Sequence, residues 1–414
     1  TSAADSRLDL SANLTITNDF NLGGNSMILR GPNTLAGGVV TLNNADSLIQ
    51  VVGACTIDND LDFTADSNTG KGLDFNDDVT LSGDITMSAD PIFDFAANTL
   101  SYTGAAIDVS ANTLTLTGTG TFDNTNNLVL NKGDSLIKLS GSTVSKVRQL
   151  EDVNADKGIN VTTNASIITT FTSEADSRLD LSANLTITND FNLGGNTMIL
   201  RGPSTLDGGV VTLNNVDSLI QVLGSCTINN DLEFTADSNS GKGLDFNDNV
   251  TLSGDITMSA DPIFDFAANT VLYQGAAVDV SANTLTFLGT GTFDNSGNNF
   301  NLNRATSLIK LSGSTVSNVN QEEDMNADKG INVSTTASTI TTFTSAADSR
   351  LDLSANLTIT NDFNLGGNTM ILRGPNTLAG GVVTLNNADS LIQVAGACTI
   401  DNDLDFTADS NTGK

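Results

Sequence analysis

Carboxylates are the side chains of this sequence most able to take part in chemistry. Asp and Glu together number 48 against 17 Lys and Arg, and the chain contains no His and no Trp. Asp74 and Asp94 fall at matching points of two neighbouring segments, and Asp58, Asp60 and Asp62 form a second acidic group. Because hard cations prefer several carboxylate and carbonyl oxygens, both groups are candidate calcium ligands.

Solvated surface carboxylates are nevertheless the preferred interpretation of both groups. A second copy of this part of the chain has Asn229 in place of Asp58 and Glu233 in place of Asp62, and no Gly-Gly-x-Gly-x-Asp repeat occurs. Stacked like charges are unfavourable unless they are screened or bridged. We therefore predict no resident cofactor and no metal ligands, with Ca²⁺ as the cation that the Asp74–Asp94 pair would bind if it binds one.

The same inventory argues against an enzyme. Without His, general base catalysis at neutral pH would need a carboxylate with a strongly shifted pKa. An enzyme of this fold would need one set of catalytic side chains at defined separations. Here most groupings of polar residues in the first copy recur in the second. No Ser-nucleophile context, phosphate-binding loop or Cys-pair metal spacing appears. We predict no catalytic and no cofactor-binding residues.

Cysteine chemistry is restricted by position. Cys55, Cys226 and Cys398 occupy the same place in successive copies of a long repeat. At the spacing of stacked strands, successive copies would lie roughly 40 Å apart, far beyond the reach of a disulfide. We expect each cysteine to be a small buried apolar residue, with a reactive thiol or an interchain bridge as the lesser alternative.

The long repeat organises the whole chain. Residues 1–10 return from Thr172, with one substitution, and again from Thr344, and the second copy is one residue longer because Gly297 is inserted. We predict long repeats over 1–171 and 172–343 and a partial third repeat over 344–414. These repeats are expected to form one continuous rod.

Each long repeat contains a shorter period of apolar–polar–apolar triplets. Residues 8–10, 14–16 and 20–22 are such triplets, separated by Ser, Asn, Asp and Thr residues typical of turns. A triplet is the shortest strand that buries two side chains on one face. Three strands and three bends per turn predict an all-β, three-sided parallel β-helix, or β-solenoid, of about 21 residues per coil. Eight coils fill each long repeat, and the parallel connections favour right-handed winding.

The pattern assigns the inward residues. Coil by coil, those of the first copy are Leu8/Leu14/Phe20, Met27/Leu35/Val40, Ile49/Cys55/Leu61, Leu73/Val79/Ile85, Phe93/Leu100/Ile107, Leu114/Phe122/Leu128, Ile137/Val144 with a degraded third side, and Ile159/Ile167/Phe171. The inward phenylalanines, expected to stack along the core, are Phe20, Phe63, Phe75, Phe93, Phe95, Phe122 and Phe171.

Outward positions and bends also follow from the triplets. An outward hydroxyl row is expected on the second strand of each coil, at Thr15, Thr56, Thr80 and Ser101. Bend asparagines, which tolerate left-handed backbone and could form side-chain ladders, are Asn13, Asn18, Asn59 and Asn112. The segment from Val144 to Gly158 is predicted to be an exposed loop. An ice-binding surface would need two outward Thr per strand, whereas a triplet offers one.

Charge and composition exclude several partners. The formal net charge of −31 repels nucleic acid and anionic membranes, although only 16% of residues are charged, which is unlike an acidic disordered tail. No apolar run is long enough for a transmembrane helix and no signal peptide is visible, so no membrane insertion is expected in this segment. The sequence starts without Met and ends within a repeat, which indicates a segment of something longer.

The triplets at 8–10, 14–16, 79–81 and 114–116, with their Asn, Gly and Asp bends, resemble bacterial surface β-solenoids. This group comprises the filamentous-haemagglutinin-like adhesins and autotransporter passenger domains. The resemblance covers the whole chain, and it implies secretion, an extracellular or cell-surface location and a stalk-like or adhesive role. The near-identical long copies depart from the more divergent coils of that group, and they suit an array whose length matters more than any one site.

These observations favour a structural extracellular fibre or stalk, part of a longer surface adhesin or filament. The expected partners are further coils, through end-to-end self-association or continuation of the same chain, and host or surface glycans. The alternative is a carbohydrate-binding or carbohydrate-cleaving parallel β-helix. The absence of Trp and the presence of only 2 Tyr argue against stacking platforms for sugars.

Overall fold

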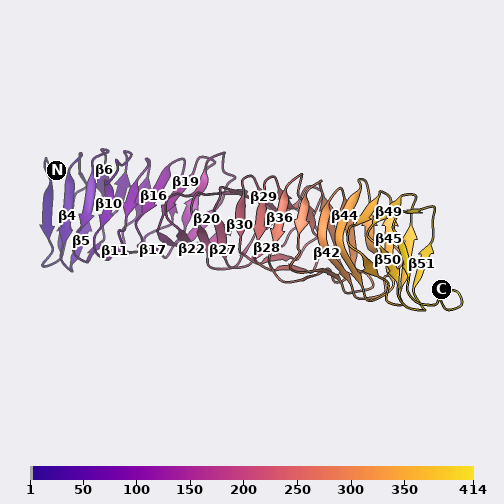
Figure 1. Ribbon diagram of the computed structural model, residues 1–414. Helices are drawn as coiled ribbons and strands as arrows, with labels where there is room; N and C mark the ends of the chain where they lie inside the picture. Colours follow the sequence, from indigo (N-terminus) through magenta and orange to yellow (C-terminus); the bar gives the residue numbers. More distant parts are fainter. Residues whose placement is uncertain (1–2) are drawn as a thin grey trace. The chain divides into compact units, whose positions relative to one another are not determined.

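The computed structural model describes residues 3–414, and the described residues form strands and turns without any helix (Figure 1). The strands of this part of the chain pair in parallel; residues 6–9, for example, pair with residues 27–30 of the next coil. The chain makes about 18 turns of roughly 22 residues each. The predicted all-β parallel solenoid is therefore confirmed.

The chain divides into two compact units. The first contains the residues up to 192 together with 198–209, and the second contains 193–197 together with 210–414. Within each unit, strands from successive turns pair on three sides, which we number one to three in chain order from Ser6.

In the first unit, side one consists of β1 (Ser6–Asp9), β4 (Ser26–Arg30), β7 (Leu48–Val51), β10 (Gly72–Phe75), β13 (Ile92–Asp94), β16 (Thr113–Thr117), β19 (Leu136–Ser140), β21 (Gly158–Val161), β23 (Ser177–Leu181) and β26 (Thr197–Arg201). Side two consists of β2 (Leu14–Ile16), β5 (Thr34–Gly37), β8 (Cys55–Ile57), β11 (Val79–Leu81), β14 (Thr99–Tyr102), β17 (Thr121–Asn124), β20 (Thr143–Gln149), β22 (Ser166–Ser173), β24 (Leu185–Ile187) and β27 (Thr205–Gly208). Side three consists of β3 (Phe20–Asn21), β6 (Val40–Leu42), β9 (Leu61–Phe63), β12 (Ile85–Met87), β15 (Ile107–Asp108), β18 (Leu128–Leu130) and β25 (Phe191–Asn192).

In the second unit, side one consists of β29 (Leu219–Val222), β32 (Gly243–Phe246), β35 (Ile263–Asp265), β38 (Thr284–Leu288), β41 (Leu308–Ser312), β43 (Gly330–Val333), β45 (Ser349–Leu353), β48 (Thr369–Arg373) and β51 (Leu391–Val394). Side two consists of β30 (Cys226–Ile228), β33 (Val250–Leu252), β36 (Thr270–Tyr273), β39 (Thr292–Asp294), β42 (Thr315–Gln321), β44 (Ser338–Ser345), β46 (Leu357–Ile359), β49 (Thr377–Gly380) and β52 (Thr399–Ile400). Side three consists of β28 (Val211–Leu213), β31 (Leu232–Phe234), β34 (Ile256–Met258), β37 (Val278–Asp279), β40 (Phe300–Leu302), β47 (Phe363–Asn364), β50 (Val383–Leu385) and β53 (Leu404–Phe406).

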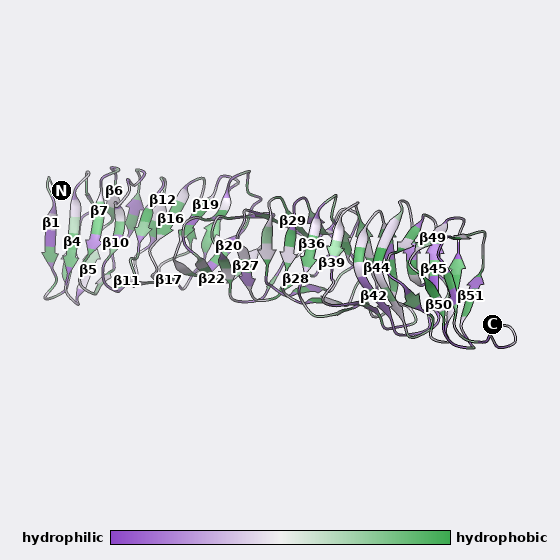
Figure 2. Ribbon diagram, viewed as in Figure 1, coloured by the Kyte–Doolittle hydropathy of each residue, from purple (hydrophilic) through white to green (hydrophobic). Residues whose placement is uncertain are grey.

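Alternating hydropathy along these strands explains the winding. Figure 2 shows hydrophobic and hydrophilic residues following one another within the arrows. In β11, Val79 and Leu81 are buried while Thr80 between them is exposed, and β8 repeats the pattern one coil earlier. Successive side chains of a strand point to opposite faces, so each triplet buries two apolar side chains in a core enclosed by three sides.

The predicted phenylalanine stack forms that core. Six of the seven predicted residues are fully buried, whereas Phe20, in the first coil, is half-buried. Rings of successive coils touch: Phe75 stacks on Phe95 with centroids 6.0 Å apart, and Phe95 stacks on Phe122 at 6.0 Å. Such offset pairs stabilise the core by about 0.5–1.5 kcal/mol each beyond their buried area.

The predicted loop from Val144 to Gly158 is wrong in its first half. Residues 143–149 form the seven-residue strand β20, which pairs with β17 on side two and, through Val147 and Gln149, with β18 on side three. The strand turns the corner because the Asn124 side chain bonds the backbone N–H and C=O of Lys146, at 3.1 and 2.7 Å. The third side of this coil is thus a strand whose inward residues are Val147 and Gln149.

The inward assignment of Ile167 is also wrong. In β22 (residues 166–173), Ser166 and Ile168 are buried and Ile167 between them is 39% exposed. Two adjacent isoleucines make the alternation ambiguous by one residue, and only the register Val144↔Ile168 fixes which of them points inward.

The bends are held by side chains that reach the next coil. The Oδ1 atom of Asn13 accepts a hydrogen bond from the Thr34 N–H at 3.0 Å, and Asp60 accepts one from the Asp84 N–H at 2.8 Å. Asn112 instead donates to the Met87 carbonyl at 3.1 Å. These bonds replace the expected ladders between asparagine side chains.

Left-handed backbone occurs at other residues than the asparagines named from the sequence. Among the described non-glycine residues, positive φ angles are confined to six positions, namely Ala96, Ser110, Asp156, Ala267, Ser281 and Asp328. The last three repeat the first three one copy later. Asn13, Asn59 and Asn112 therefore serve as hydrogen-bonding caps, and none of the four bend asparagines supplies a left-handed turn.

Candidate functional site

Asp74 and Asp94 lie side by side, as the sequence predicts. They are partners in the register of β10 and β13, with both side chains outward on side one. Gln50 donates from Nε2 to Asp74 Oδ2 at 2.7 Å, and Asn76 donates from Nδ2 to Asp74 Oδ1 at 3.0 Å. Both oxygens of Asp74 thus already accept hydrogen bonds from amides, which offset the repulsion from Asp94.

The second copy repeats this arrangement. Asp245 and Asp265 are register partners in β32 and β35. Gln221 and Asn247 donate to the two oxygens of Asp245 at 2.7 and 2.9 Å. Over residues 3–414, no three His, Cys, Asp or Glu side chains gather in a way that could hold a metal ion. Solvated carboxylates stay the prediction for these pairs, with calcium as the alternative.

The acidic group at residues 58–62 does not converge on one point. Asp58 accepts from the Ser82 hydroxyl at 2.6 Å at the corner after β8, whereas Asp60 caps the Asp84 N–H. Asp62 is outward in the middle of β9, beside Thr86 of β12. The three carboxylates serve separate positions of two sides, so their spacing in sequence does not create a ligand set.

A shallow groove with a volume of about 430 Å³ lies on side two of the first unit. We call it the hydroxyl groove; its walls are Pro32, Ala54, Cys55, Thr56, Asp78, Val79, Thr80, Thr99 and Ser101. Thr56, Thr80 and Ser101 form one outward row across β8, β11 and β14, as predicted. Thr15 is not part of the row, because its register partner is Ala36 and the row continues instead to Thr34.

The hydroxyl groove offers hydrogen-bonding groups without an activated one. Asp78 is committed to the backbone, since its Oδ1 atom accepts from the Thr99 N–H at 2.8 Å. Burial raises the pKa of the Cys55 thiol to about 11, with the charge of Asp77 adding to the effect, so the thiolate is scarce at neutral pH. In the second copy Leu272 replaces Ser101, which interrupts the row.

The cysteines are free, as predicted. Cys55 and Cys226 are buried and Cys398 is half-buried. Burial also raises the pKa of Cys226, to about 12, with a smaller contribution from Asp248. These positions behave as small apolar residues at the core edge.

An ion-pair cluster marks the start of the second copy. Arg201 in β26 reaches Asp156 across two coils, with Nη1 to Oδ1 at 2.9 Å. Burial raises the pKa of the neighbouring Asp180 carboxyl, while the Arg201 charge opposes the shift. Arg373 and Asp328 repeat the bridge in the second unit at 2.6 Å.

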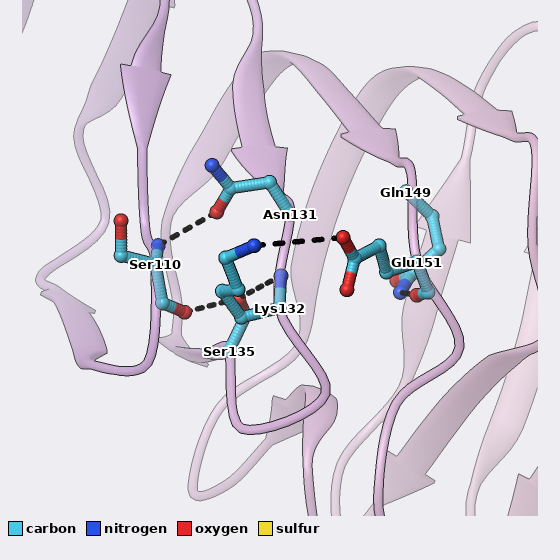
Figure 3. A network of polar contacts seen from close by, with 6 residues as sticks. All are labelled: Ser110, Asn131, Lys132, Ser135, Gln149 and Glu151. Atoms are coloured by element: carbon cyan, nitrogen blue, oxygen red, sulfur yellow. Dashed lines mark hydrogen bonds and ion pairs between the residues drawn. The ribbon is translucent and has the colours of Figure 1, made fainter.

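A polar network joins three successive coils near the end of the first copy (Figure 3). The Ser110 N–H donates to Asn131 Oδ1 at 2.9 Å, and the Ser135 hydroxyl donates to the Ser110 carbonyl. Lys132 adds an ion pair with Glu151 at 3.6 Å, in which both side chains are more than half exposed. Such an exposed ion pair contributes little to stability. The main effect of the network is therefore to hold the left-handed bend at Ser110 through its two hydrogen bonds.

Sequence reasoning missed the amide donors to Asp74, the two-coil reach of Arg201 and the hydroxyl groove. The first two depend on which residues become neighbours across coils separated by 24 and 45 positions. The groove is visible in the sequence only as a row of Thr and Ser.

No helix in the described part of the chain is long and apolar enough to cross a membrane. No protein-family model matches the sequence, and the searches of curated proteins and of solved structures gave no match. What can be stated of this chain therefore rests on its own residues and geometry: it is a parallel β-solenoid of tandem repeats.

Proposed function

We propose that this chain is the shaft of a structural fibre or stalk that works at the cell surface or outside the cell. The observation that carries the proposal is the coil-to-coil pairing of sides one and two, which continues through each unit, whereas the pairing on side three is interrupted. Backbone pairing and the aromatic core extend from one coil to the next, and each near-identical copy adds the same number of coils to the length.

Length is the property to test. A variant with one additional copy of residues 172–343 gains eight coils, which should extend a rod by about 40 Å at strand spacing. Electron microscopy of both proteins measures the increment directly. Particles that grow in width or become globular would contradict a shaft, and immunolabelling of the producing cells would contradict it if the label were confined to the cytoplasm.

Electron microscopy also tests whether the chain associates with further coils and whether calcium is needed for that association. Val394, Leu404 and Phe406 are 48%, 41% and 62% exposed and line an apolar hollow of about 320 Å³ together with Leu385 and Ile400. We propose that another coil covers this surface, either from the same chain or from a second molecule. Fibres that dissolve with a chelator would support a calcium role for the Asp74–Asp94 pair, and fibres that persist would leave backbone pairing as the main contact.

Carbohydrate binding is the second candidate, and the hydroxyl groove favours it. Its Thr and Ser hydroxyls could exchange hydrogen bonds with sugar hydroxyls on an open surface. Glycan-array binding that disappears in Thr80→Val and persists in Thr251→Val, at the equivalent position of the second copy, would support this role. Absence of binding to any glycan would remove it.

A further inference from the structure

Side two of the second unit carries two adjacent columns of outward hydroxyl residues. We call these six residues the threonine array: Thr315, Ser317, Thr339, Thr341, Thr358 and Thr360. The register pairs Thr315 with Thr339 and Thr339 with Thr358, so β42, β44 and β46 align the first column. The second column follows two residues later in each chain segment, because Val316, Ile340 and Ile359 between the columns are buried and also in register.

The first column continues beyond the array. Thr270 pairs with Thr292 and Thr292 pairs with Thr315, which makes five successive coils with threonine at the same place. The triplet pattern of the sequence predicts one outward residue per strand, whereas β42 and β44 are longer and each present two in the array. The structure thus contains a surface with two columns of hydroxyl residues, whereas the triplet pattern predicted one column.

Thr360 is exposed and the other five residues of the array are half-buried. Ser317 donates to Asp294 at 3.0 Å, but in the described chain no hydrogen bond engages the hydroxyls of Thr315, Thr339, Thr341, Thr358 and Thr360. None of the six residues is charged, although the protein as a whole has a net charge of −31. The six residues therefore form a neutral strip, which the Asp294 carboxylate borders on the coil before Ser317.

Geometry gives the strip a two-dimensional lattice. Neighbouring strands lie about 4.8 Å apart, and alternate residues of one strand lie about 6.6 Å apart. Threonine side chains are stiff at χ1, so methyl and hydroxyl groups repeat at nearly fixed positions. Water bonded to such an array costs little entropy to order, because the protein has already fixed its partners. These spacings are comparable to the repeat distances of oxygen atoms in the surface planes of ice.

We propose that the threonine array orders water into an ice-like layer and binds the surface of ice crystals. A neutral array of alternating methyl and hydroxyl groups suits a water lattice better than it suits an ion or a charged polymer. A crystalline polysaccharide is the competing occupant of a flat hydroxyl lattice, and the test below separates it.

The chain provides its own matched variant. In the first unit, Thr143, Ser145, Thr169, Thr186 and Thr188 occupy the equivalent positions, but Ile167 stands where the array has Thr339. Ile167 is outward and 39% exposed, so this position of the fold accepts isoleucine without a change of register. Thr339→Ile should therefore fold normally and lose the central hydroxyl, and Ile167→Thr should complete a second array.

The experiment measures inhibition of ice recrystallisation by the full chain. We expect the unmodified protein to inhibit, Thr339→Ile to lose most of the inhibition and Ile167→Thr to gain. Thr384→Ile, an outward threonine of β50 on side three, should leave inhibition unchanged. Circular dichroism melts of all four proteins confirm equal folding.

Three results would overturn the proposal. The first is an unmodified protein no more active than serum albumin at equal concentration. The second is an equal loss in Thr339→Ile and Thr384→Ile. The third is retention on chitin or cellulose particles that Thr339→Ile abolishes, in a protein without effect on ice, since this would assign the array to polysaccharide.

Discussion

Arg148 donates two hydrogen bonds to a single oxygen of Glu174 in the next coil, from Nη2 at 2.6 Å and from Nε at 2.9 Å to Oε1. In the next copy Asn320 and Ala346 stand at these two positions, so both partners change together. Thr344 then donates to Asn320 at 2.7 Å in place of the ion pair. The Arg148–Glu174 pair is therefore a property of one junction between copies.

This pairing predicts non-additive substitutions. Arg148→Asn and Glu174→Ala should each weaken the local structure, whereas the double variant, which adopts the residues of the next copy, should cost less than the sum. For an exposed pair the coupling free energy is about 0.2–1 kcal/mol, and it should shrink as salt is added. Hydrogen exchange of β22 in the four proteins measures it. Additive effects at low salt would show that the pair contributes nothing.

Phe264 should be a position of large stability loss in the second unit. Its ring lies 5.5 Å from that of Phe234, 5.7 Å from Phe287 and 6.0 Å from Phe293. Phe264→Ala should destabilise the surrounding coils by about 3–5 kcal/mol, because both the buried area and the ring contacts are lost. Leu272→Ala is the control, since Leu272 is 37% exposed. Thermal melting that shifts equally for both variants would contradict the stacked core.

Replacing Gly208 with alanine should destabilise the protein. Its φ is +121°, and a Cβ atom there would collide with the Ile187 carbonyl of the previous coil. Gly208→Ala should lower stability by about 1–3 kcal/mol through backbone strain, with a further cost from the collision. Gly297→Ala should be nearly neutral, because open space surrounds Gly297. Equal melting temperatures of the two variants would refute this description of the bend.

The thiols predict a graded reaction with iodoacetamide at pH 8. Cys55 and Cys226, with pKa values raised by burial to about 11 and about 12, should react slowly in the native protein, and half-buried Cys398 should react first. In denaturant all three should react alike. The raised pKa values also mean that the stability they contribute is complete below pH 9, the ordinary thiol pKa, and is lost as pH rises toward 11 and 12. Rapid native labelling of Cys55 would contradict its burial.

The period of the triplets explains how much of the fold was predictable. Apolar residues two apart, separated by turn residues, define strands, sides and the inward phenylalanines from local information alone. The prediction failed where local information was ambiguous. Ile167 and Ile168 both fit an inward position, and Val144 and Val147 are three residues apart because β20 bends around Asn124.

Positions along one strand were thus determined by the sequence itself, because alternation is a property of a single strand. The neighbours of each residue on the adjacent coils were decided only by the tertiary structure. Register between coils brought Gln50 to Asp74, Arg201 to Asp156 and Thr339 to Thr315 and Thr358. The coils differ in length, so sequence spacing alone does not define these contacts. Hydrogen bonding between parallel strands, together with the packing of buried side chains, defines them.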